Sequence, residues 1–270
     1  MEYKKEKINT ALLLAAGVGS RMQHLTNDSP KCLAEVSGVS ILERLTLCLR
    51  HHGFKKLIVV VGYMDCCIRE FLGHSINGLT IDYIVNNRYR TTNNIYSLWL
   101  AREMIHEPFL LVESDIVFDK HLLGKMLYPD CIAVSQILPW MSGTTATINK
   151  LRRVLSLNLG QCVTGESSYK TVNIYSLSLP SWRLVEKRLE EHISSGHVNE
   201  YYEIVFAEMI SEGSLSFKPV FFNAAQWYEI DTIKDLQKSE LIFSKKLRMM
   251  GPRPQFAKID ELDMPPLVDC

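Results

Sequence analysis

The sequence predicts an α/β protein built on a doubly wound, mixed but mostly parallel sheet. The run 57–61 is apolar and β-branched without interruption, which is typical of a strand covered on both faces. Segments with apolar residues at helical spacing lie between such runs. The first apolar run, 11–14, leads directly into a glycine turn. Open α/β sheets place phosphate-binding loops at that position.

The first half of the chain alternates strands with helices. Ser40 and Glu43 form a capping box, and Gly53 is suited to end the helix that follows. Asp65 can cap the next helix. The β-α-β order favours parallel pairing, because parallel neighbours require a crossover connection. We expect strands at 11–14, 57–61, 79–85 and 108–112, and helices at 40–53, 65–71 and 95–104.

From residue 131 the predicted strands are short and are separated by Gly, Ser and Thr. We interpret this half as an elaboration of the same sheet, so that 1–247 forms one domain. Residues 248–270 are acidic, contain four prolines and show no periodicity, which predicts a linker or tail that could lead to a second domain beyond residue 270. We expect strands at 131–136, 144–149, 154–159, 169–177, 215–220 and 227–230, and helices at 180–194, 201–211 and 232–247.

The composition excludes several classes of protein. Lys plus Arg and Asp plus Glu number 30 each, so no global charge attracts the chain to nucleic acid or to a membrane surface. No apolar run approaches the roughly 20 residues that a membrane-spanning helix needs. The seven cysteines are scattered without a C-x-x-C pair, which argues against a disulfide framework and favours reduced thiols and a cytoplasmic location.

The loop after the first strand is the strongest candidate for anion binding. Gly17 and Gly19 let backbone N–H groups approach an anion without an intervening Cβ, and Arg21 adds positive charge. Met22 stands where a dinucleotide fingerprint needs a third glycine, and no Gly-Lys-Ser/Thr phrase occurs, so neither common phosphate motif is present. A tight strand-to-helix turn is the plain alternative. The expected phosphate-facing residues are Leu14, Ala15, Ala16, Gly17, Gly19 and Ser20.

Two aspartates follow predicted strands that lie far apart in the sequence. Asp115 follows the strand 108–112, and Asp231 follows the strand 227–230. Each could simply cap a helix. Together they could converge on one Mg²⁺ ion, which prefers one or two carboxylates plus substrate phosphates. Lys31 follows Pro30 and is predicted to be held in an extended conformation.

The whole phrase from Leu14 to Lys31 resembles the signature of nucleotidyltransferases, which join an NTP to a sugar phosphate or alcohol phosphate and have a Rossmann-like fold. The phrases 93–97 and 228–231 look like the branch of choline-phosphate and 2-aminoethylphosphonate cytidylyltransferases. The resemblance covers about residues 8–247. It implies a nucleotide-binding part at 1–130 and an acceptor-binding part at 131–247.

The resemblance also implies roles for individual residues. Arg21 and Lys31 would be catalytic, through the leaving pyrophosphate and the α-phosphate respectively. Asp115 and Asp231 would hold Mg²⁺, and Glu229 is a further candidate ligand. The cytosine and ribose would lie near Gly62, Tyr63, Asn93, Asn94 and Ser97.

The acceptor side is less specific. The phrase 170–176 looks more like the phosphonate enzymes, so Lys170 is expected to bind the phosphonate. Trp140, Glu200, Tyr201 and Tyr202 are candidates for the cationic end of the acceptor. Aromatic faces suit a quaternary ammonium, whereas a carboxylate such as that of Glu200 suits a primary one. Packing on a helix face is the plain alternative for both tyrosines.

The resemblance implies a Mg²⁺-dependent transfer of CMP from CTP to 2-aminoethylphosphonate, with release of pyrophosphate, for tailoring of cell-surface lipids or glycans. The acceptor oxygen is already ionised at neutral pH, so the reaction needs positioning and charge neutralisation rather than a general base. Phosphocholine is the nearest alternative acceptor. A sugar-1-phosphate nucleotidyltransferase and a catalytically silent nucleotide-binding module are the remaining alternatives.

Overall fold

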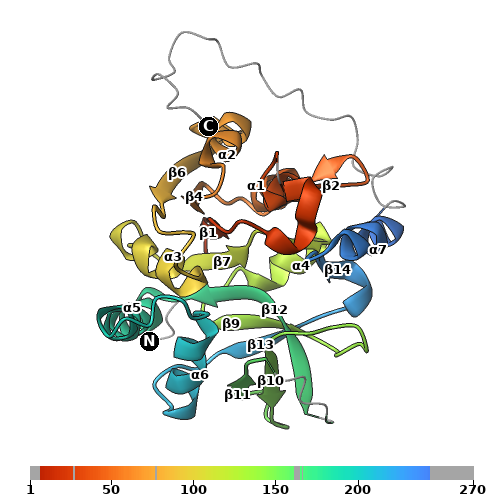
Figure 1. Cartoon of the computed structure of the whole chain (residues 1–270). Helices are drawn as coiled ribbons and strands as arrows, with labels where there is room; N and C mark the ends of the chain where they lie inside the picture. Colours follow the sequence, from red (N-terminus) through yellow and green to blue (C-terminus); the bar gives the residue numbers. More distant parts are fainter. Residues whose placement is uncertain (1–6, 27, 77, 161–164, 166, 244–270) are drawn as a thin grey trace.

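A ten-stranded mixed sheet forms the centre of the protein in this computed structural model, which describes residues 7–26, 28–76, 78–160, 165 and 167–243. Its parallel part consists of β1 (Thr10–Ala15), β4 (Lys56–Val61), β6 (Leu79–Val85) and β7 (Phe109–Glu113). β1 lies between β4 and β7, and β6 pairs with β4 (Figure 1). The predicted α/β class with a mixed, mostly parallel sheet is therefore confirmed.

The second half of the chain extends the same sheet in antiparallel fashion. The ten-residue strand β12 (Ser168–Leu177) pairs antiparallel with β7, with β9 and with β10. The remaining strands of this sheet are β5 (Ser75–Ile76), β9 (Cys131–Ser135), β10 (Thr145–Ile148), β11 (Val154–Asn158) and β13 (Lys218–Phe222).

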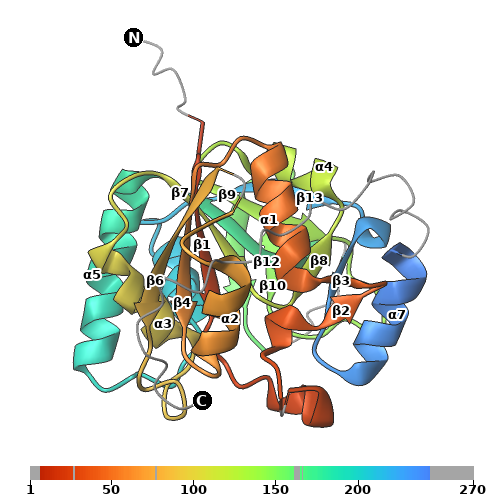
Figure 2. The same cartoon turned by 90° about the horizontal axis from the view of Figure 1, so that it is seen from above.

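Helices cover both faces of the sheet (Figure 2). Alternate residues of β1 point to opposite faces, as a pleated strand requires: Leu13 packs in one core with α1, α2 and α4, whereas Leu12 packs in the other with α3, α5 and α6. Strands buried on both faces explain the continuous apolar runs of the sequence. The helices are α1 (Ile41–His51), α2 (Asp65–Leu72), α3 (Asn94–Leu100), α4 (Lys120–Leu123), α5 (Leu179–Ser194), α6 (Glu203–Ser211) and α7 (Ile233–Phe243).

The helix caps only partly follow the prediction. Ser40 Oγ accepts a hydrogen bond from Glu43 N at 3.1 Å and caps α1 as expected. The expected cap at Asp65 is wrong, because Met64 occupies that position with φ 48° and Asp65 lies inside the first turn. The Asp65 carboxylate instead accepts a hydrogen bond from Arg69 Nε, one turn later, at 2.9 Å.

Several short elements were not expected from the sequence. The most consequential is β8 (Ile116–Phe118), which pairs antiparallel with β14 (Trp227–Glu229) in a separate two-stranded sheet. The others are β2 (Glu35–Val36), β3 (Val39–Ser40), and the 3₁₀ segments η1 (Ser20–Thr26), η2 (Lys31–Leu33), η3 (Ala101–Glu103), η4 (Gly124–Met126) and η5 (Ala224–Gln226).

Three expectations concern the whole chain. Cys32, Cys48, Cys67 and Cys131 are free thiols, but Cys66 is disulfide-bonded, so a fully reduced chain was the wrong expectation. The spacing of the cysteines in the sequence does not predict whether Cys66 forms a disulfide. In the described residues, no helix has the length and apolar character needed to cross a bilayer. The predicted tail at 248–270 lies outside the described residues.

Candidate active site

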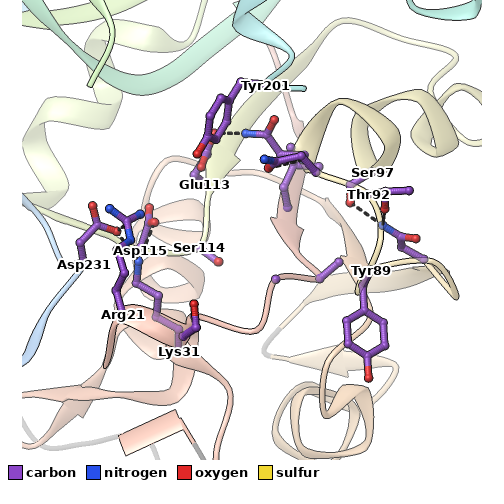
Figure 3. Close-up of a pocket in the computed structure, with 18 residues that line it drawn as sticks. Arg21, Lys31, Tyr89, Thr92, Ser97, Glu113, Ser114, Asp115, Tyr201 and Asp231 are labelled. Carbon is purple, nitrogen blue, oxygen red and sulfur yellow. Dashed lines mark hydrogen bonds and ion pairs between the residues drawn. The ribbon is translucent and has the colours of Figure 1, made fainter. Parts of the chain in front are cut away.

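A pocket of about 260 Å³ opens at the carboxyl ends of β1, β6 and β7, the edge at which open α/β sheets bind ligands (Figure 3). Charged side chains lie at one end of the pocket, and amide and hydroxyl groups lie at the other. The lining residues are Leu14, Ala16, Gly17, Gly19, Ser20, Arg21, Lys31, Asn86, Tyr89, Thr92, Asn93, Asn94, Ser97, Glu113, Ser114, Asp115, Tyr201 and Asp231.

The two glycines of the first loop serve different purposes. Gly19 has φ 67°, and a Cβ there would lie 3.1 Å from Lys31 Cβ and 3.3 Å from Thr26 Cγ2. A side chain at this position would therefore be strained and would press on the lysine that faces the pocket. Gly17 has no atom within 4 Å of its ideal Cβ position. It leaves open space on the pocket side, where backbone N–H groups can face an anion.

Lys31 bridges two aspartates that come from distant parts of the chain. Its Nζ lies 2.9 Å from Asp115 Oδ2 and 2.8 Å from Asp231 Oδ1. Arg21 reaches the same Asp231 oxygen at 2.8 Å from a much more exposed position. The side chains of Lys31, Asp115 and Asp231 are only 11%, 16% and 18% exposed, so water screens the triad weakly.

Local structure brings the two aspartates together. The β8–β14 ladder pairs Ile116 with Glu229, and Ile230 N donates to Asp115 O at 2.9 Å. Asp231 is not the cap of α7, which was one reading of its sequence position. Thr232 takes that role: its Oγ1 accepts from Asp235 N, and Asp235 Oδ2 accepts from Thr232 N. The Asp231 carboxylate is left facing the pocket.

The protonation of Lys31 follows from its two partners. Burial acts to lower the pKa of Lys31, but attraction to Asp115 and to Asp231 outweighs it and raises the pKa above its ordinary value. The lysine is therefore a fixed positive charge at neutral pH. Such a charge can stabilise negative charge that develops on a phosphoryl group.

The aspartate pair also has the chemistry of a magnesium site. Asp115 Oδ1 is buried and has no hydrogen-bond partner among the described residues. The other carboxylate oxygen of Asp115, Oδ2, contacts Lys31 Nζ, and so does Asp231 Oδ1. The ammonium of Lys31 therefore balances the charge of both carboxylates. The described residues contain no group of three or more acidic, His or Cys side chains that could hold a metal ion. Two carboxylates fit Mg²⁺, which takes its other ligands from phosphates and water.

The opposite end of the pocket is a rigid polar surface. The buried Asn86 donates from Nδ2 to Ser97 Oγ at 3.1 Å and to Thr92 Oγ1 at 3.2 Å, and its Oδ1 accepts from Arg88 N. Asn93 caps α3 by accepting from Asn94 N. These residues offer fixed amide and hydroxyl groups in a position suited to a base or a sugar.

A second group of carboxylates lies beside the triad. Burial and repulsion by Glu203 raise the pKa of Glu113 well above its usual range. Burial likewise raises the pKa of Glu203 to about 7, although Lys170 opposes the shift. Burial raises the pKa of Glu229, and again Lys170 opposes the shift. The region is thus rich in buried carboxyl groups whose raised pKa values favour the neutral, protonated form.

The structure brings most of the predicted phosphate and nucleotide residues to this pocket, but Gly62 and Tyr63 do not line it. A Cβ at Gly62 would lie 2.9 Å from both Ala16 O and Tyr89 Cβ, so this glycine permits close packing of two loops. Tyr63 N donates to Ala16 O at 3.1 Å. Its hydroxyl donates to Thr26 O at 2.8 Å, which supports the first loop from behind. Ala15 is the last residue of β1 and is buried.

The predicted acceptor residues are spread over several places. Lys170 is buried and lies 3.2 Å from Glu229 Oε2, and Glu229 Oε1 accepts from Asn173 Nδ2. Trp140 is 54% exposed and lines a separate cavity of about 50 Å³, together with Glu229 and Asp231. Asp231 therefore lines both cavities.

Two other predicted acceptor residues do not face the pocket. Glu200 contacts His192 Nδ1 at 3.2 Å and His197 Nδ1 at 2.9 Å. Tyr202 is buried in an aromatic cluster with Tyr175 and Phe206. Its neighbour Tyr201 lines the pocket and lies beside Glu113 (Figure 3).

Sequence reasoning missed several lining residues: Asn86, Tyr89, Thr92, Glu113 and Ser114. A signal was present for two of them. Asn86 directly follows the predicted strand 79–85, and Glu113 directly follows the predicted strand 108–112. Both positions lie at the carboxyl edge of a parallel sheet, where ligands bind.

Comparisons with known proteins agree with this geometry. Residues 11–129 match the family described as MobA-like NTP transferase domain. The chain is 27% identical over 249 residues to the CMP-5'-(3-aminopropyl)phosphonate synthase of Streptomyces rubellomurinus, covering 87% of this chain and 38% of the relative. It is 26% identical over 234 residues to the 2-aminoethylphosphonate cytidylyltransferase of Lancefieldella rimae, covering 86% of this chain and 91% of the relative.

A solved structure shares the fold. The CTP:phosphocholine cytidylyltransferase of Streptococcus pneumoniae superposes with a TM-score of 0.75 at 20% identity, over 88% of this chain and all of that one. The chain is a nucleotidyltransferase in which residues 11–129, with the pocket at their sheet edge, are similar to the MobA-like NTP transferase domain.

Proposed function

We propose that this nucleotidyltransferase is a Mg²⁺-dependent cytidylyltransferase that transfers CMP from CTP to 2-aminoethylphosphonate and releases pyrophosphate. The observation that carries the proposal is the pocket with two different ends: Lys31 bridges Asp115 and Asp231 at one end, and Asn86 presents fixed polar groups at the other. The names of the relatives from S. rubellomurinus and L. rimae favour an aminoalkylphosphonate acceptor.

In the proposed complex the triphosphate lies along the loop that contains Gly17 and Gly19. Arg21 is exposed and can turn to the β- and γ-phosphates, where a guanidinium binds two oxygens at once. Lys31 faces the α-phosphate and neutralises the charge that builds as the new bond forms. Asn93 and Ser97 face the nucleoside together with the Asn86 amide.

Asp115 and Asp231 are the proposed Mg²⁺ ligands, and the buried Oδ1 of Asp115 is the oxygen without another partner. Bound Mg²⁺ would neutralise phosphate charge and help the pyrophosphate to leave. Glu229 supports this pair indirectly in our proposal, since its carboxylate is engaged by Lys170 and Asn173.

The acceptor is proposed to enter from the side of β12 and β14. Lys170 lies there as a buried ammonium beside Glu229, which lines the cavity of Trp140 together with Asp231. A phosphonate oxygen held near Lys170 attacks the α-phosphorus in line, and the bond to the pyrophosphate oxygen breaks. The phosphonate oxygen is already ionised, so the protein does not have to supply a general base. Its task is to position the two substrates for the attack.

Pyrophosphate release measured with each NTP and a panel of acceptors tests the proposal. We expect release with CTP, Mg²⁺ and 2-aminoethylphosphonate, and much less with UTP, GTP or ATP. Release with phosphocholine but not with the phosphonate would show that phosphocholine is the acceptor, and the proposed cytidylyltransferase activity would stand. Release only with glucose-1-phosphate and UTP would assign a sugar nucleotidyltransferase, and no release with any pair would indicate a silent nucleotide-binding protein.

A further inference from the structure

Three ion pairs converge on the two proposed metal ligands, as Figure 3 shows. Lys31 Nζ lies 2.9 Å from Asp115 Oδ2 and 2.8 Å from Asp231 Oδ1. Arg21 Nη2 lies 2.8 Å from the same oxygen of Asp231. The carboxylates that are proposed to hold Mg²⁺ are thus already neutralised by basic side chains of the chain itself.

Mg²⁺ and the ammonium of Lys31 would compete for the same oxygens. Mg²⁺ binds carboxylate oxygens at about 2.0–2.1 Å. Lys31 Nζ already lies within 2.9 Å of one oxygen of each aspartate, so a metal on a shared oxygen would lie within roughly 5 Å of the ammonium. Like charges this close repel strongly, and water screens them weakly because Lys31, Asp115 and Asp231 are largely buried. The two cations therefore exclude each other.

The side chain of Lys31 has room to leave the aspartates, whereas its backbone is fixed. Ala34 N donates to Lys31 O at 3.0 Å at the start of η2. The aliphatic stem passes Gly19, where a Cβ would lie 3.1 Å from Lys31 Cβ and 3.4 Å from Lys31 Cδ. Gly19 therefore leaves space along the stem. Because Gly17, Gly19 and Lys31 line one pocket, rotation of the side chain can carry the ammonium from the aspartates to an anion in the glycine loop.

We propose that Lys31 is an internal countercation that keeps a divalent metal ion off Asp115 and Asp231 until a triphosphate draws its ammonium away. This inference rests on the proposed function and adds to it the order in which metal and nucleotide bind. The triphosphate oxygens attract both Lys31 and Arg21, which releases the two carboxylates to the metal that accompanies the nucleotide. The site therefore takes its metal together with the NTP and binds the metal alone only weakly.

The donor set agrees with this order of binding. The part of the chain that the structure describes contains no group of three or more acidic, His or Cys side chains that could hold a metal ion. Glu229, the further candidate ligand, is engaged at both oxygens: Lys170 Nζ lies 3.2 Å from Oε2, and Asn173 Nδ2 donates to Oε1 at 3.2 Å. A metal that arrives alone would therefore have to displace Lys31 without phosphate oxygens to complete its coordination.

Titration of the nucleotide-free protein with Mn²⁺, as a spectroscopic substitute for Mg²⁺, tests the inference without turnover. The paramagnetic resonance signal of unbound Mn²⁺ gives the Kd. We expect Lys31→Met, which removes the charge and keeps the stem, to lower the Kd by roughly tenfold or more relative to the wild type. Adding Asp115→Asn to Lys31→Met should abolish the gain. Lys56→Met is the matched control, because Lys56 pairs with Asp82 at 2.8 Å and does not line the pocket.

An equal Kd for Mn²⁺ in the wild type and in Lys31→Met, or no binding in either, would overturn the inference. A gain that survives Asp115→Asn would also overturn it, since the metal would then lie elsewhere. Lys31→Gln is the second variant if Lys31→Met does not fold, and it should show the same gain. The titration uses no NTP and no acceptor, so an unchanged Kd would leave the proposed cytidylyltransferase intact. Tighter Mn²⁺ binding would stand even if no transfer to any acceptor were found.

Discussion

At the scale of residues, the role of Asp231 depends on the side chains that follow it in the sequence. An aspartate before a helix is usually its cap. Here Thr232 and Asp235 satisfy each other at the start of α7, and Asp231 pairs with Lys31 and Arg21 instead. The sequence predicted Asp231, Lys31 and Arg21, with Asp115, as one set of four charged residues.

The first residue-scale prediction concerns Lys31→Ala. We expect kcat to fall by a factor on the order of 10² to 10³, as it does when one contact to developing transition-state charge is lost. The triad geometry explains this, because Lys31 supplies the fixed charge nearest both aspartates. Steady-state pyrophosphate release at saturating CTP measures the effect, with melting temperature as a check on folding.

Lys56→Ala is the matched control for that measurement. Lys56 also forms an ion pair with an aspartate, since its Nζ lies 2.8 Å from Asp82 Oδ2. This pair joins β4 to β6 and is partly exposed to solvent. Exposed pairs contribute little, roughly 0.2–1 kcal/mol. The control should therefore keep its kcat. A wild-type rate in Lys31→Ala would remove Lys31 from the mechanism.

At the scale of elements, long runs were predicted well and short ladders were not. The β-branched run 57–61 lies within β4, and the predicted strand 79–85 coincides with β6. The strands β8 and β14 have three residues each and pair across more than a hundred positions of sequence. Local periodicity cannot specify such a pairing. β13 begins at Lys218, later than expected, because the buried Leu215 and Phe217 precede the strand and extend its apolar pattern.

The loop after β1 allows a prediction that separates folding from binding. Gly19→Ala should destabilise the protein by roughly 1–2 kcal/mol, because the residue has positive φ and its Cβ would press on Lys31 and Thr26. Gly17→Ala meets no protein atom within 4 Å, so it should keep wild-type stability and instead weaken CTP binding. Urea denaturation and nucleotide titration, done on both variants, measure the two effects. Equal loss of stability in both variants would contradict this account.

At the scale of the whole molecule, the active site is assembled from both halves of the chain. The proposed nucleotide part, 1–130, supplies Lys31 and Asp115 to the pocket, and the proposed acceptor part, 131–247, supplies Asp231. The long strand β12 joins the two parts, because it pairs with β7 of the first part and with β9 and β10 of the second. Sequence phrases could identify each half, but their convergence depends on this topology.

Metal and nucleotide together should therefore stabilise the whole fold. Asp115 and Asp231 repel each other once Lys31 turns to the phosphate, and a shared Mg²⁺ would link the two parts again. Ligand at 100 times its Kd adds about 2.7 kcal/mol to stability. For a protein of this size, each kcal/mol raises the melting temperature by about 2–4 °C.

We expect CTP with Mg²⁺ to raise the melting temperature by roughly 5–10 °C under those conditions. CTP in the presence of EDTA should give much less, because the phosphates would then face the two aspartates without a cation between them. Asp115→Asn should lose most of the metal-dependent part, whereas Asp82→Asn, which changes a surface pair, should retain it. If EDTA leaves the CTP-induced shift intact, the aspartates bind no metal and the fixed charge of Lys31 must hold the triphosphate without one.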